Sequence, residues 1–300
     1  MTPVRILAAA LALCVTAVAG CGLGPGKDEG DVDLTVTRDY GTKVMLQKSD
    51  SIRESDTVIR LLDRNTDITT RYGGGFIQSI DGLAGSESGG HRSDWFFYVN
   101  GIESPVGSAA YDPSGGDRIW WDYRDWSAAM RVPAVVGSWP EPFLHGFQGR
   151  QWTTHPVCLT VGDVCDTVAD HLESAGIRSR GSGPQLATLL VGPWSAILGE
   201  PPADLLAHGP DRSGVFARFV GTRKPLLDLL NQEGQPAGSI GKGGGLIAAL
   251  RPGEGPPTWV VTGTDAEGVA AAANLLGDAL RNHYAVATQP GAGPIGVPVP

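Results

Sequence analysis

The sequence predicts an α+β protein of two domains. Its 300 residues are enough for about two domains, and 41% of them are hydrophobic, which suffices to build packed cores. Residues 31–127 show two strand patterns, one helical pattern and then further strands, the order of a small α+β domain. In residues 156–288, strand and helix patterns follow one another, which predicts a second, α/β domain with a mixed sheet.

The elements of the first domain follow from short hydrophobic patterns. Residues 32–36 alternate between apolar and polar, as in a half-buried strand. Residues 57–65 carry an apolar helical pattern, with Ser55 or Asp56 as its expected N-cap. Strands are expected at residues 32–36, 44–46, 76–80, 95–99 and 118–123, with a loop rich in Gly and Ser at 82–93.

The second domain is expected to contain two helices among its strands. Asp163 precedes an apolar helical pattern that Gly176 ends. Thr264-x-x-Glu267 is a capping box, which predicts a second helix reaching to about Leu280. Strands are expected at residues 157–161, 186–191, 215–220, 226–230 and 259–261, although the fourth of these also fits a helix.

Two stretches rich in Pro and Gly flank the second domain. Residues 128–155 are expected to be a connector whose aromatic side chains pack on a neighbouring surface. Residues 289–300 are expected to be a disordered tail, because they offer little apolar surface to bury.

The N-terminus predicts export and a lipid anchor. After Arg5, an uncharged stretch runs to Gly20 and is too short for a stable membrane span. It ends in Val-Ala-Gly-Cys21, which resembles the bacterial lipobox and implies that Cys21 becomes the acylated first residue. The alternative is an ordinary signal peptide whose cleavage site contains a cysteine. We therefore expect a signal peptide at 1–20, a lipidated tether at 21–30, and a location on the extracytoplasmic face of the cell membrane.

Cys158 and Cys165 remain once the signal peptide and the anchor have been set aside. Two cysteines in an exported protein favour a disulfide. The alternative is a metal site, but two thiols by themselves are too few for a ligand set.

Two aromatic segments of the first domain form a recognisable pattern. The first reads Trp95-Phe-Phe-Tyr98-Val-Asn100-Gly101, in which Asn-Gly predicts a tight hairpin. The second is a Gly-Asp pair followed by Trp120 and Trp121. Together they resemble the small β-grasp-like domain at the C-terminus of transcobalamin and intrinsic factor, whose bacterial versions are mostly domains of unknown function. The resemblance covers residues 31–127.

This resemblance implies a fold and one candidate ligand. It implies a β-grasp-like fold for the first domain. In transcobalamins the domain helps to enclose cobalamin together with a large helical domain, and this sequence shows no such helical domain. A corrinoid is therefore one candidate ligand among several.

Side chains of the aromatic strands are the candidate ligand-binding residues. Successive residues of a strand point to opposite faces, and here both faces carry aromatic rings, so one face fills the core and the other is available as a platform for a flat ligand, a sugar or a protein. The alternative is that residues 128–155 or the second domain cover that other face. The candidates are Trp95, Tyr98, Asn100, Trp120, Trp121, Tyr123 and Trp126.

Several common types of functional site lack an essential residue in this sequence. Asp63-x-Asn65-x-Asp67 begins like a calcium loop, but position 68 is Ile instead of Gly and position 74 is Gly instead of Glu. The glycines around Lys242 lack the Ser or Thr of a phosphate loop. There is no nucleophile elbow. A net charge of −9 disfavours nucleic acid as a partner. No metal, cofactor or enzymatic activity is predicted.

These observations predict a membrane-anchored extracytoplasmic lipoprotein that binds a small extracellular ligand or an envelope partner, such as a transporter that receives the ligand. The alternative is a structural or interaction module of the cell envelope with no small ligand. An enzyme with its site in or beside the second domain is the third reading, and no set of nucleophile, base and acid in the sequence supports it.

Overall fold

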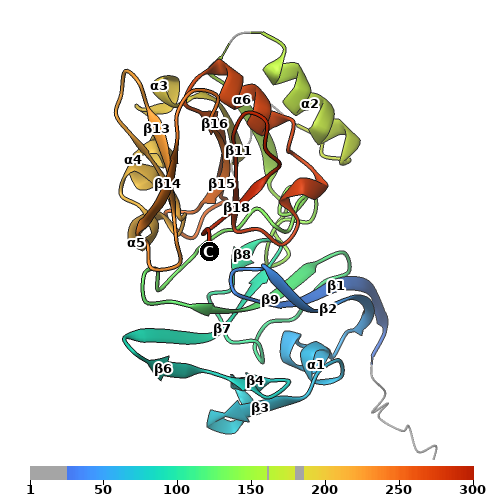
Figure 1. Ribbon diagram of the computed structural model, residues 1–300. Coiled ribbons are helices and arrows are strands. Elements are labelled where there is room, and N and C mark those ends of the chain that lie inside the picture. Colours follow the sequence, from blue (N-terminus) through green and yellow to red (C-terminus); the bar gives the residue numbers. More distant parts are fainter. Residues whose placement is uncertain (1–25, 161, 180–185) are drawn as a thin grey trace, which may run out of the picture.

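The computed structural model describes residues 26–160, 162–179 and 186–300 (Figure 1). The signal peptide, Cys21 and the rest of the tether up to residue 25 lie outside these residues. The described part consists mostly of strands in four sheets, with a few short helices, so the predicted α+β class is confirmed. No helix in the described ranges is long and apolar enough to cross a membrane.

The first part of the chain is built on a mixed sheet with the strand order β2-β1-β9-β7-β6. Its strands are β1 (Asp28–Arg38), β2 (Lys43–Arg53), β6 (Ser86–Ser88), β7 (His91–Val99) and β9 (Arg118–Asp125), and β8 (Ile102–Glu103) also pairs with β7. β1 runs antiparallel to β2 and parallel to β9. Helix α1 (Val58–Asp63) buries Val58, Leu61 and Leu62, and its N-cap is Thr57 rather than Ser55 or Asp56.

The hairpin between β7 and β8 confirms the prediction made from Asn100-Gly101. Both residues have positive φ, 53° and 74°. A Cβ on Gly101 would lie 2.7 Å from the carbonyl oxygen of Val135, so glycine is needed here for space as well as for conformation.

A small antiparallel sheet lies beside α1 at the far side of this part from the second domain (Figure 1). It consists of β3 (Ile68–Arg71), β4 (Phe76–Ile80) and β5 (Leu83–Ala84), with a 3-10 turn, η1 (Tyr72–Gly74), between the first two. The segment 82–93, expected to be a loop, in fact contributes β5, β6 and the start of β7.

The second part is built on another mixed sheet, with the order β10-β11-β16-β15-β17-β18. β10, β11 and β16 are parallel, and the remaining pairings are antiparallel. The strands are β10 (Thr153–Cys158), β11 (Leu186–Pro193), β15 (Gly245–Leu250), β16 (Thr258–Gly263), β17 (Ala285–Thr288) and β18 (Ile295–Val297).

Two layers cover this sheet (Figure 1). α2 (Val164–Ser174) and α6 (Ala266–Ala273) pack on one face with Ile247 and Val261. A three-stranded sheet and three short helices pack on the other face with Leu246 and Val260. They are β12 (Ala217–Val220), β13 (Leu226–Leu230), β14 (Pro236–Ile240), α3 (Trp194–Ile197), α4 (Pro201–Ala207) and α5 (Pro210–Ser213).

Two predictions about the end of the chain are wrong. Thr264 does not cap α6, because its hydroxyl donates to the carbonyl of Gly241, and Asp265 accepts from the N–H of Gly268 instead. The helix ends at Ala273, and a 3-10 turn, η2 (Asp278–Leu280), follows. Residues 289–300 are not a free tail, because β18 pairs with β17 and so extends the second sheet.

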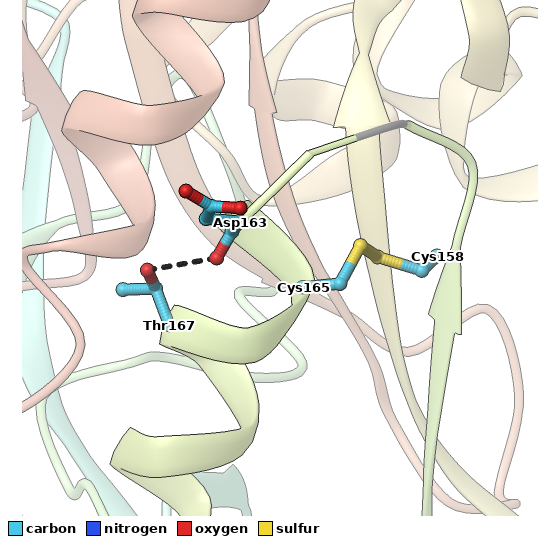
Figure 2. Close-up of a disulfide and its surroundings, with 4 residues drawn as sticks. All are labelled: Cys158, Asp163, Cys165 and Thr167. Atoms are coloured by element: carbon cyan, nitrogen blue, oxygen red, sulfur yellow. Dashed lines mark hydrogen bonds between the residues drawn. A yellow bond between two sulfur atoms is a disulfide. The ribbon is translucent and has the colours of Figure 1, made fainter.

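The disulfide between Cys158 and Cys165 is confirmed, with the two Cα atoms 6.2 Å apart. Figure 2 shows it joining the end of β10 to the first turn of α2. Asp163 stands at the predicted N-cap, but its main-chain carbonyl accepts from the Thr167 hydroxyl, at 3.0 Å, and its side chain makes no capping bond.

Aromatic side chains of residues 128–155 pack on the second sheet, as expected. The rings of Trp139 and Phe143 lie 5.8 and 5.0 Å from that of Trp259 on β16. Val136 and Phe147 belong to the same continuous cluster of buried residues. The connector thereby joins the cores of the two parts.

Candidate functional site

The seven candidate residues do not gather in one open pocket. Tyr98 and Trp120 are only 0% and 2% exposed, because Tyr284, which precedes β17, packs edge-on against both rings. Tyr40 and Phe216 pack next to them. The second part of the chain thus covers this face of β7 and β9, which was the alternative left open by the sequence.

A hydrogen-bonded network runs through this covered face. Asp122 accepts from Thr37 Oγ1 (2.6 Å), from the N–H of Gly41 (3.0 Å) and from Tyr284 OH (2.9 Å). Trp120 Nε1 donates to Thr37 Oγ1 at 2.7 Å. Burial raises the pKa of Asp122 to about 6, against the opposing effect of its hydrogen bonds. Trp120 also lines a separate cavity of about 240 Å³, whose walls include Arg118 and Asn282. The network joins the two parts of the chain, because Tyr284 of the second part donates to Asp122 of β9.

Asn100 has a structural role in the hairpin. Its Nδ2 donates to Asp117 Oδ1 (2.7 Å) and to the carbonyl of Gly146 (2.9 Å), and its Oδ1 accepts from the N–H of Arg118 (2.8 Å). Asn100 is 1% exposed, so its polar atoms are used within the protein.

The remaining candidate tryptophans, Trp95, Trp121 and Trp126, line spaces beside Phe76 of β4. Phe76 is 42% exposed, and its ring packs 6.4 Å from that of Tyr72, which is 87% exposed. Phe76 lines two spaces: a cavity that Trp95 and Trp121 also line, and a groove that Trp126 also lines. We call these the apolar cavity and the polar groove.

The apolar cavity has a volume of about 220 Å³. On its outer edge, β7 pairs with β6 up to Ser93 and with β8 from Tyr98 onward, so the residues between these two have no strand partner there. The cavity opens at this gap. Its lining residues are Gly75, Phe76, Ile77, Trp95, Phe96, Phe97, Glu103, Ser104, Gly107, Ser108 and Trp121.

Trp121, one of the residues that line this cavity, has a buried indole N–H without a partner in the described structure. The indole N–H groups of the neighbouring tryptophans do have partners: that of Trp95 donates to the carbonyl of Leu83 (2.8 Å), and that of Trp120 donates to the hydroxyl of Thr37. Trp259 Nε1 is also unpaired, but Trp259 lines neither the apolar cavity nor the polar groove. A buried donor without a partner is energetically costly.

The polar groove, of about 300 Å³, combines rings with charges. The Arg92 guanidinium lies 4.0 Å from the ring centre of Trp126. Arg71 and Asp94 also line the groove. Burial raises the pKa of the Asp94 carboxyl, and the hydrogen bond from the N–H of Trp95 opposes this. The groove therefore offers a flat ring and charges of both signs.

Tyr123 positions the wall of the groove. Its hydroxyl lies 3.0 Å from both the Ser86 hydroxyl and the carbonyl oxygen of Ala84. These contacts fix the chain from Ala84 to Ser86, and all three of these residues line the groove.

Sequence reasoning missed Tyr72, Phe76 and Arg71 as members of the site. The available signal was the run Arg-Tyr-Gly-Gly-Gly-Phe, in which three glycines separate two aromatic residues. The apparent calcium ligands 63–67 form no such site, and the described residues contain no group of three His, Cys, Asp or Glu side chains suited to a metal ion.

Comparison with known proteins bears on this same segment. Residues 55–125 match DUF4430, a domain of unknown function. The match contains every residue of the apolar cavity and, apart from Trp126, every residue of the polar groove.

A solved structure from Ruminococcus gnavus ATCC 29149, described as a candidate metal binding protein, is similar over a limited region. It covers 32% of this chain and 98% of its own, with 15% identity and a TM-score of 0.26. No curated protein matches the chain.

Proposed function

We propose that the protein is a lipid-anchored, extracytoplasmic binding protein whose small ligand occupies the apolar cavity and the polar groove. The observation that carries the proposal is the partly exposed ring of Phe76, which lines both spaces together with Trp95, Trp121 and Trp126. The lipobox-like sequence at Cys21 supports the location.

The two spaces define the class of ligand. The apolar cavity suits a flat apolar group, because Phe76, Trp95 and Trp121 are among its lining residues. The polar groove suits a charged or polar extension, because Arg71, Arg92 and Asp94 surround the ring of Trp126. At about 220 and 300 Å³, these spaces hold a small ligand or one part of a larger one, so a corrinoid would enter only in part.

We also assign residues 31–127 to a β-grasp-like, transcobalamin-C-terminal-like domain. Three features support this assignment: the β1–β2 hairpin, the single helix α1 against the sheet, and the parallel pairing of β1 with β9.

The test is a titration of the lipid-free protein, starting at Gly22, with cobalamin and a panel of heteroaromatic acids, following the indole N–H signals by NMR. A ligand is expected to shift the signals of Trp121 and Trp126. The signal of Trp259 serves as the matched control, because that indole is also unpaired but lies outside both spaces.

Variants then locate the site. Phe76→Ala is expected to weaken binding about tenfold or more, because it removes an aromatic wall shared by both spaces. Val44→Ala removes a comparably exposed apolar side chain from β2 and is expected to have no effect. Binding that is unchanged in Phe76→Ala, or a ligand that shifts only Trp259, would refute the proposal.

An interaction module of the envelope is the second candidate function, and the exposure of Tyr72 and Phe76 favours it. In that case a double variant, Tyr72→Ser/Phe76→Ser, is expected to lose a partner that co-purifies with the wild-type protein from membranes. Retention of that partner by the double variant would count against this reading.

A further inference from the structure

A third cavity lies away from the aromatic site, where the connector meets the second part of the chain. It has a volume of about 470 Å³ and carries three arginines from three separate segments: Arg131, Arg212 and Arg251. We call it the arginine cavity. The concentration of positive charge is notable in a chain with a net charge of −9. Its other lining residues are Met130, Pro133, Leu205, Asp211, Pro252, Gly253 and Glu254.

Arg251 is held rigidly, with its side chain only 3% exposed. Its Nε donates to the carbonyl of Gly255 (2.8 Å) and its Nη2 to the carbonyl of Glu254 (2.7 Å). No hydrogen bond within the described residues satisfies its Nη1. The Glu254 carboxylate lies 3.6 Å from Nη2 but is 71% exposed, so it neutralises this buried charge only weakly.

The other two arginines differ in their ion pairing. Arg131 Nε lies 3.7 Å from Glu103, and Arg212 forms no ion pair with any described residue. Burial lowers the pKa of Arg251; Glu254 raises it, and the nearby charge of Arg131 lowers it further. Asp211 and Glu254 also belong to the lining, so with Glu103 three carboxylates accompany the three arginines, and Arg212 is the one arginine of the lining without an ion pair among the described residues.

We propose that the arginine cavity binds a phosphate group, either as inorganic phosphate or as the headgroup of a phospholipid. A guanidinium presents paired N–H donors that match the oxygens of an oxyanion. Three guanidinium groups from three segments suit the several acceptor oxygens of a tetrahedral phosphate better than the two of a carboxylate. The exposed Met130 and the neighbouring Leu205 would contact an apolar substituent on the phosphate.

The first experiment is calorimetric titration of the lipid-free protein with inorganic phosphate, against sodium chloride at equal ionic strength. Arg131→Gln and Arg212→Gln are each expected to weaken phosphate binding about tenfold, the effect of losing one charged hydrogen-bonding group. Arg53→Gln on β2 makes the same change of charge outside the cavity and is expected to leave binding unchanged.

Vesicles distinguish the two sources of phosphate. Sedimentation with phosphatidic acid vesicles, compared with neutral phosphatidylcholine vesicles, tests the headgroup. Binding to inorganic phosphate alone identifies a soluble ligand, whereas binding to phosphatidic acid alone identifies a lipid headgroup, and both results require the two arginines. The proposal is overturned if neither form binds above its control, or if the Arg131→Gln/Arg212→Gln double variant binds as the wild type does.

Discussion

Tyr284 donates a hydrogen bond of 2.9 Å to Asp122, across the contact between the two parts of the chain. Tyr98 in turn donates to the hydroxyl of Tyr284 at 3.2 Å, so a chain of buried polar groups runs from β7 through the second part to β9. Such a network fixes the relative position of the two parts, because a half-satisfied network is costly.

The first prediction concerns the pH dependence of stability. The folded pKa of Asp122, raised by burial to about 6, lies above its value in the unfolded chain. The protonated form therefore favours the folded state: this contribution is fully present below about pH 4 and is lost as the pH rises through about 6. Asp122→Asn is neutral throughout. Relative to this variant, the wild type is expected to lose on the order of 3 kcal/mol of unfolding free energy between pH 4 and 7.

Urea unfolding followed by tryptophan fluorescence at a series of pH values measures this difference. Asp112→Asn changes an exposed carboxylate and is the matched control. Parallel stability curves for the wild type and Asp122→Asn would show that Asp122 does not titrate in this range.

The second prediction concerns Tyr284→Phe. The substitution leaves one oxygen of Asp122 and the hydroxyl of Tyr98 without this partner, while the ring packing remains. The unfolding free energy is expected to fall by about 1–3 kcal/mol at pH 7, and by less at pH 5, where Asp122 is protonated. Tyr72→Phe removes a hydroxyl from an 87% exposed ring and is expected to have no measurable effect. Equal effects of the two substitutions would contradict a joining role for Tyr284.

The third prediction concerns the disulfide. Cys158 and Cys165 are separated by 7 positions, so the bond closes a short loop. The double variant Cys158→Ala/Cys165→Ala is expected to lose roughly 2–3 kcal/mol of unfolding free energy. Reductant should lower the melting temperature of the wild type and leave that of the double variant unchanged. A wild type insensitive to reductant under unfolding conditions would count against the predicted stabilisation.

The fourth prediction concerns the anchor. Cys21→Ala removes the thiol that would receive the lipid. The variant is expected to lose incorporation of labelled palmitate and to move from the membrane fraction to the soluble extracytoplasmic fraction. If the wild type itself incorporates no palmitate, the sequence is an ordinary signal peptide with a cysteine at its cleavage site.

Elements governed by local interactions were predictable from the sequence. The strand at β4 has the predicted bounds, because its residues are flanked by glycines on both sides. The hairpin at Asn100-Gly101 follows from two residues that tolerate positive φ. The disulfide follows from two nearby cysteines within one strand–helix connection.

Contacts between distant segments decided the rest. The sequence pattern predicted Thr264 as a helix cap, but its hydroxyl donates a hydrogen bond to the carbonyl of Gly241, in a loop more than twenty residues earlier. β18 forms because β17 offers an edge to pair with, which no pattern within residues 289–300 reveals.

The candidate site shows the same division. Alternation along a strand is local, so the sequence was enough to show that aromatic side chains occupy both faces of β7 and β9. Which rings are available depends on distant contacts: Tyr284, 186 positions from Tyr98, covers one face, while the bend at residues 72–76 leaves Phe76 exposed beside Trp121. Burial depends on what packs from elsewhere in the chain, and a strand pattern carries no information about that partner.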